Sequence, residues 1–256
     1  MKRFLLLLAS FFVLCALHPA HLAAKELTFA ASSPLDSYQA RVASAILSEA
    51  LNRNNHTFRA QSFPSLRALA MSNAGYVDGE LHRVYEFHQV SNGQYPNLVR
   101  IDSKLMTIYL SVFTTVQDAY VKDWRDLKGK DVGYLLGRQN VKTKLNEVSD
   151  SDHIFPQPKE INLFSMLASN RFKFIISESV EGQSILRSSP KFRDIYEVTR
   201  LEETYIYAYL HMKHKELAKT LATTIDKMKA DGTFGKIVSK VTEEYLSGYL
   251  LTSKQK

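Results

Sequence analysis

From residue 25 onward, short apolar runs alternate with longer segments in which apolar residues recur every three or four positions. The first pattern is typical of strands and the second of amphipathic helices. The first unit reads strand, helix, strand, helix, strand, with Asp36 or Ser37 capping its first helix and its third strand starting at 76–77. Such alternation predicts an α/β protein, with a mainly parallel sheet flanked by helices.

A second unit begins after Lys104 with a β-favouring run at 105–113. Buried-type strands are predicted at 131–136 and 172–176, a helix at 138–148, and a further strand-rich segment at 195–210. Two helices, separated by Asp231 and Gly232, complete the pattern. No repeat or low-complexity linker separates the units, so we expect ordinary strands to cross between them.

The first 24 residues have the pattern of an export signal. Lys2 and Arg3 precede an apolar stretch at 4–17, and small residues end at Ala23 and Ala24. The apolar stretch is too short for a stable membrane anchor, so we expect cleavage near Ala24, with an uncleaved anchor as the alternative. The sequence therefore predicts an exported protein.

Removing residues 1–24 changes the chemistry available to the protein. It takes away Lys2, Arg3 and no acidic residue, so the formal net charge falls by two, from +7 to +5. It also removes Cys15, the single cysteine, and with it any disulfide, thiolate nucleophile or thiolate metal ligand. The remaining positive charge is spread along the chain and does not indicate a nucleic-acid partner.

Three segments resemble the extracytoplasmic solute-binding proteins of ABC importers. They are the Gly-x-x-Asp-Gly stretch at 73–83, the Asp-Leu-Lys-Gly-Lys-Asp-Val-Gly stretch at 126–133 and the terminal helix pair around 227–237. They occur in the family's order and spacing. Each alone is a weak motif, and the resemblance rests on all three together, which span nearly the whole mature chain.

This resemblance implies the two-lobe, type 2 periplasmic-binding fold of the polar-amino-acid group. Lobe 1 would comprise 25–106 plus 204–256 and lobe 2 would comprise 107–203, joined by two hinge strands. The protein would be a periplasmic monomer without a cofactor. It would capture a small anionic or zwitterionic, amino-acid-like ligand in the cleft between the lobes and deliver it to an inner-membrane permease.

Several residues of lobe 1 are candidates for the ligand site. Ser32, Ser33 and Tyr38 lie where the first strand leads into a helix, and hydroxyls with free amides at a helix N-terminus suit a carboxylate. Helix capping alone also explains such serines. Arg83 is the expected charged anchor, since a guanidinium binds a carboxylate bidentately, and Arg100 competes for this role.

In lobe 2, Arg138 stands where the family often has a hydroxyl, and it would hold a second anionic group or point to solvent. Glu178 matches the position of the family's ammonium-binding Asp, and a helix cap or a solvated carboxylate is its alternative. Tyr109 is the aromatic residue that we expect to stack on the ligand.

Two other function classes stay open. A sensing subunit for a membrane receptor would share every feature above. An enzyme on the same fold is a further alternative, although no catalytic set and no metal site stand out by spacing. We therefore expect a binding protein rather than a catalyst.

Overall fold

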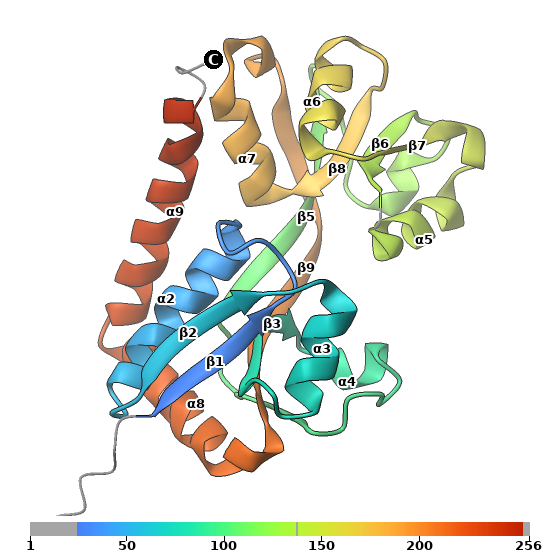
Figure 1. Cartoon of the computed structure of the whole chain (residues 1–256). Coiled ribbons are helices and arrows are strands. Elements are labelled where there is room, and N and C mark those ends of the chain that lie inside the picture. The colour runs from blue at the N-terminus through green and yellow to red at the C-terminus, as the bar shows by residue number, and fades with distance from the viewer. Residues whose placement is uncertain (1–24, 137, 253–256) are drawn as a thin grey trace, which may run out of the picture.

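The structure is a computed structural model that describes residues 25–136 and 138–252. The expected signal peptide at 1–24 lies outside the described residues. Figure 1 shows two groups of elements connected by the long strands β5 and β9. The strands are β1 Glu26–Ala31, β2 Thr57–Ser62, β3 Gly79–Val84, β4 Leu98–Arg100, β5 Met106–Thr114, β6 Val132–Leu135, β7 Ile154–Gln157, β8 Phe174–Glu178 and β9 Tyr196–His211.

In the described chain, α-helices and short 3-10 helices occupy the connections between these strands and the segment that follows β9. The α-helices are α2 Tyr38–Asn52, α3 Ser65–Asn73, α4 Phe87–Val90, α5 Gln139–Val148, α6 Glu160–Ala168, α7 Ser179–Ser188, α8 Lys215–Ala230 and α9 Thr233–Thr252. The 3-10 helices are η1 Trp124–Leu127, η2 Ser151–His153, η3 Pro190–Phe192 and η4 Met212–His214.

The described strands form one mixed sheet in the order β2-β1-β3-β9-β5-β8-β6-β7, and β4 pairs with β9. β1 is parallel to β2 and β3, and β6 is parallel to β7 and β8. β9 is antiparallel to β3, β4 and β5. The α/β class predicted from the sequence is confirmed, because each end of the sheet is a parallel unit whose connections are helical.

Two groups of elements pack around separate cores. We call β1–β4, α2–α4, α8 and α9 lobe 1, and β6–β8 with α5–α7 lobe 2. The main core of lobe 1 joins α2, α8 and α9 to the sheet through fully buried residues such as Leu47 and Leu221. Lobe 2 has one core on each face of its sheet, around Val132 and around Phe164. Because each lobe has its own core, the two lobes can move relative to each other by bending of the strands that join them.

β5 and β9 run from one lobe into the other and pair with each other over Met106–Thr114 of β5. The register shifts twice, between Leu110 and Ser111 and between Val112 and Phe113. The boundaries at 106/107 and 203/204 stay predictions, because backbone pairing is continuous through the long strands and does not itself mark where one lobe ends.

The third strand begins later than the sequence predicts. Tyr76 lies in a turn with 82% of its surface exposed, and β3 starts at Gly79. A Cβ at Gly79 would lie 2.2 Å from the carbonyl oxygen of Tyr209 on β9. The strand therefore enters the sheet at a residue that permits this close backbone approach.

Candidate functional site

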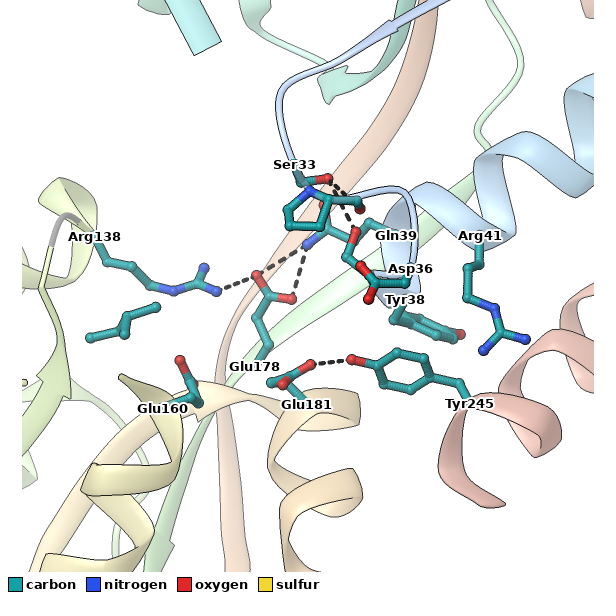
Figure 2. Close-up of a pocket in the computed structure, with 13 residues that line it drawn as sticks. Ser33, Asp36, Tyr38, Gln39, Arg41, Arg138, Glu160, Glu178, Glu181 and Tyr245 are labelled. Atoms are coloured by element: carbon teal, nitrogen blue, oxygen red, sulfur yellow. Dashed lines mark hydrogen bonds and ion pairs between the residues drawn. The ribbon is translucent and has the colours of Figure 1, made fainter. Parts of the chain in front are cut away.

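A cleft of about 800 Å³ lies between the two lobes. Figure 2 shows side chains from both lobes converging on it. Its lining residues are Ser33, Pro34, Asp36, Ser37, Tyr38, Gln39, Arg41, Leu135, Arg138, Glu160, Glu178, Glu181 and Tyr245.

The cleft follows the carboxyl ends of strands and the beginnings of helices. The segment between β1 and α2 supplies the serines, and Leu135 ends β6. Glu160 is the first residue of α6, and Glu178 both ends β8 and caps α7. Ligand sites in open α/β sheets form at such ends, because the connecting loops there leave polar groups unpaired by the sheet.

The wall contributed by lobe 1 is built from hydroxyl groups. Ser37 is the N-cap of α2, and its Oγ accepts from the backbone N–H of Ala40 at 3.4 Å. Ser33 Oγ lies 3.1 Å from Ser37 Oγ and 3.1 Å from His82 Nε2. Burial, assisted by the charge of Arg83, lowers the pKa of His82 to about 4, so this imidazole is neutral near pH 7.

The wall contributed by lobe 2 contains an ion pair. Arg138 precedes α5, and its guanidinium lies 2.7 Å from Glu178 Oε1. Burial opposes the charged form, but the Glu178 and Glu160 carboxylates raise the pKa of Arg138. The amide of Gln39, on α2, donates to both Glu178 oxygens at 3.1 and 2.9 Å. Glu178 therefore joins the two lobes across the cleft.

Glu160 lies beside this pair. Its carboxylate accepts a hydrogen bond from the hydroxyl of Ser177. Burial raises the pKa of Glu160, and the hydrogen bond and the charge of Arg138 only partly offset this effect. Within the described chain, no Lys, Arg or His nitrogen lies within 4.0 Å of the Glu160 carboxylate. This carboxylate thus bears a desolvation cost that a nearby cation would reduce.

α9 closes one side of the cleft and contacts both lobes, packing on α2 and α7. The Tyr38 hydroxyl lies 3.0 Å from Thr242 Oγ1, and the rings of Tyr38 and Tyr245 are 5.5 Å apart. The Tyr245 hydroxyl donates to Glu181 on α7 at 2.5 Å. Helix α9 of lobe 1 therefore contacts Glu181, a cleft residue of lobe 2, through Tyr245.

Four of the residues predicted for the site line this cleft together: Ser33, Tyr38, Arg138 and Glu178. Ser32 precedes them in the chain but is not a lining residue. Tyr109 lies on β5, where its ring centre is 4.3 Å from the Arg200 guanidinium, and it also does not line the cleft. Side chains alternate between the two faces of a strand, and the sequence alone does not show which face of β5 is turned to the cleft.

Neither arginine considered as the anchor in lobe 1 reaches the cleft. Arg83 lies on β3, where its Nε donates to Glu80 Oε2 at 2.8 Å, and the Glu80 side chain is only 1% exposed. Arg100 pairs with Asp102 and lies 3.9 Å from the centre of the Tyr85 ring. Both guanidiniums already have partners outside the cleft, which argues against the anchoring role expected for Arg83.

Sequence reasoning missed Gln39, Glu160, Glu181 and Tyr245. Glu160 and Glu181 occupy first turns of helices, where acidic residues are ordinary. The α7 helix itself was not predicted, although Ser179 follows a buried strand directly. Tyr245 lies far along the chain, and only tertiary packing brings it to the cleft.

The described residues were also compared with the requirements of a metal site and of a membrane-spanning helix. Across 25–136 and 138–252, no group of three or more His, Cys, Asp or Glu side chains is arranged to hold a metal ion. The helices described also include none with the length and apolarity needed to cross a bilayer.

Known structures resemble this fold at low sequence identity. The L-cystine solute receptor of Neisseria gonorrhoeae, in its unliganded open conformation, is 14% identical and has a TM-score of 0.64, with 85% of this chain and 93% of that chain covered. An amino-acid ABC transporter substrate-binding protein from Streptococcus pneumoniae, bound to L-arginine, is 18% identical with a TM-score of 0.59 and coverage of 86% and 96%. A histidine kinase sensor domain with similarity to periplasmic binding proteins is 12% identical with the same TM-score and coverage.

These likenesses define the fold as periplasmic-binding-protein-like. An uncharacterized protein from Shewanella oneidensis is 28% identical over 205 residues, which cover 78% of this chain and 76% of that protein. No family model matches the chain.

Proposed function

We propose that this chain is an exported, periplasmic solute-binding protein that resembles the polar-amino-acid group of ABC-importer binding proteins. It captures a small, amino-acid-like solute between its lobes and does not convert it. The observation that carries this proposal is the cleft itself, in which hydroxyl and amide groups of lobe 1 face Arg138 and Glu178 of lobe 2. Similar folds that bind amino acids support it.

The paired charges suit a zwitterion. Glu178 offers a carboxylate to an ammonium group, and Arg138 offers a planar donor to a carboxylate. In the structure a terminal nitrogen of Arg138 lies 2.7 Å from Glu178 Oε1. A zwitterionic ligand would replace that contact with one contact to each residue, so no buried charge would lose its partner. A purely anionic ligand that took Arg138 would leave Glu178 with the Gln39 amide but without a cationic partner.

Delivery to an importer and delivery to a receptor are both compatible with the cleft. The importer is supported by substrate-binding proteins of similar fold, and the receptor by a sensor domain with an equal TM-score. Co-purification from the native membrane discriminates between them. Association with a permease would support transport, and association with a kinase or another signalling receptor would support sensing.

The proposed protein is a monomer that closes on its ligand. Contacts such as Gln39 with Glu178 already span the cleft, and a ligand that binds both walls would add to them. Small-angle scattering should show one chain per particle and a smaller radius of gyration with ligand. An unchanged radius at saturation would contradict closure.

Calorimetry with a panel of amino acids tests the site. Replacing Gln39 by Trp, within the cleft, should abolish binding by filling it, whereas Gln94→Trp, on an exposed surface away from the lining residues, should not. Equal affinity in both variants would show that solutes bind elsewhere. Absence of binding by every small solute tested would contradict the proposed function.

A further inference from the structure

The side chains that line the cleft carry more negative than positive charge. The acidic ones are Asp36, Glu160, Glu178 and Glu181, and the basic ones are Arg41 and Arg138. Figure 2 shows Glu160, Glu178 and Glu181 projecting from the same wall. The whole chain has the opposite balance, with a formal net charge of +7. The negative surplus is therefore a local property of the cleft.

Both cationic side chains of the cleft already contact a carboxylate, and the buried Nε of Arg138 has no partner among the described residues. Arg138 is paired with Glu178, and Arg41 is paired with Glu244 on α9 at 3.1 Å. His82, behind Ser33, is neutral near pH 7 and adds no charge to the wall of lobe 1. A second carboxylate on a solute would thus lie near Glu160, whose carboxylate has no cationic nitrogen within 4.0 Å among the described residues.

Glu160 is the cleft carboxylate that a cationic ligand group would stabilise most. It is partly buried, its hydrogen bond from Ser177 is neutral, and no cationic nitrogen lies within ion-pair distance of it among the described residues. A carboxylate buried in this way is costly unless a charged partner reaches it. It opens onto a cleft large enough for an amino acid with an extended side chain.

We propose that the cleft selects solutes with a net positive charge, with one cationic group at Glu178 and a second, an ammonium or guanidinium, at Glu160. This inference rests on the proposed solute-binding function and narrows its ligand class. A carboxylate on the same solute would contact Arg138. Neutral and acidic amino acids would bind more weakly, because they leave Glu160 without a partner.

A purely structural role for the glutamates is the competing explanation. Glu160 and Glu181 lie in the first turns of α6 and α7, where a negative charge stabilises the helix dipole. That role predicts a loss of stability on neutralisation but no change in which solutes bind. Solute preference is therefore the readout that separates the two explanations.

The experiment is calorimetric titration with pairs of solutes that match in shape and differ in one positive charge: L-arginine with citrulline, and L-lysine with L-2-aminoheptanoic acid. We expect wild-type protein to bind the charged member of at least one pair about tenfold or more tightly. Glu160→Gln should remove most of this preference. Glu243→Gln, at an exposed position of α9 outside the lining residues, should preserve it.

The outcomes separate the inference from the function on which it rests. The inference is overturned if wild-type protein prefers the neutral member of each pair or binds only neutral or acidic solutes. Either result leaves the binding function intact, and neither depends on whether a variant folds. A folded Glu160→Gln variant that retains the charge preference overturns the role of Glu160. Failure to bind any small solute would overturn both proposals.

Discussion

Arg83→Ala should reduce stability without weakening ligand binding. The Arg83 guanidinium contacts Glu80 Oε2 through Nε and a terminal nitrogen, each at 2.8 Å, and Glu80 also accepts from Ser72 at 3.0 Å. The side chains of Glu80 and Arg83 are 1% and 15% exposed. Removing one partner of a buried pair costs about 3–5 kcal/mol, because the other charge stays buried.

The lower end of that range applies here, about 3 kcal/mol, because burial already raises the pKa of Glu80 and protonation would relieve part of the cost. For a chain of this size, about 3 kcal/mol corresponds to a fall in Tm of roughly 6–12 °C. Urea unfolding of Arg83→Ala, Glu80→Gln and the double variant measures the coupling directly.

The double variant should recover much of the lost stability, because it buries no unpaired charge. Ligand affinity of Arg83→Ala, measured by calorimetry on the folded fraction, should equal that of the wild type. A loss of affinity of tenfold or more with unchanged stability would refute this reasoning and restore Arg83 as the ligand anchor.

Three other predictions concern the cleft and its support. The pKa of His82, beside Ser33, is about 4 in the folded chain and 6.5 ordinarily, so the unfolded chain takes up the proton first as the pH falls. The free energy of unfolding should therefore fall by up to about 3 kcal/mol from pH 6.5 to 4. His82→Gln should flatten this pH profile in urea titrations. Gly182→Ala should cost about 2 kcal/mol in the same assay, since its Cβ would lie 2.3 Å from the buried Phe113 ring; an unchanged midpoint would contradict the packing. Arg138→Ala should weaken amino-acid binding about tenfold or more in calorimetry, with Arg138→Lys recovering part of the loss, and full affinity in Arg138→Ala would exclude a carboxylate contact there.

The sequence was sufficient to predict the fold because the periodicities are local. The parallel unit β1-α2-β2-α3-β3 and the paired helices α8 and α9 follow from apolar spacing and from breaks such as Gly232, whose φ is +79°. The short strand β4 and the helix α7 were missed, because three residues give little periodic signal and the Gly and Ser residues of α7 weaken its pattern.

The site was predicted less completely than the fold. Ser33 and Tyr38 could be placed because they lie where β1 leads into α2, and Arg138 and Glu178 because the resemblance to solute-binding proteins implied a ligand role at their positions near the ends of β6 and β8. Arg83, the expected anchor, does not line this cleft, and its side chain contacts Glu80, three residues earlier on the same strand. A β-bulge between Glu80 and Arg83 allows this contact, and sequence spacing does not reveal a bulge.

The charge of the cleft also depends on tertiary structure. Glu160, Glu178 and Glu181 belong to α6, β8 and α7, and each alone has an ordinary local explanation as a helix-terminal acid. Their meeting with Arg138 at one wall gives the cleft its negative surplus. The expectation of an anionic or zwitterionic solute rested on the arginines, because the sequence alone does not place these carboxylates beside Arg138.

Mass spectrometry of small molecules released from the purified protein tests the central claim most directly. The protein is isolated natively, denatured, and its released solutes are compared with those from the cleft-filling Gln39→Trp variant prepared in parallel. We predict that the wild type releases a small, nitrogen-bearing cationic solute in near-stoichiometric amount and that the variant does not. Release of the same molecule in equal amount from both proteins, or of no small molecule from a wild type that also binds none on titration, would contradict the account.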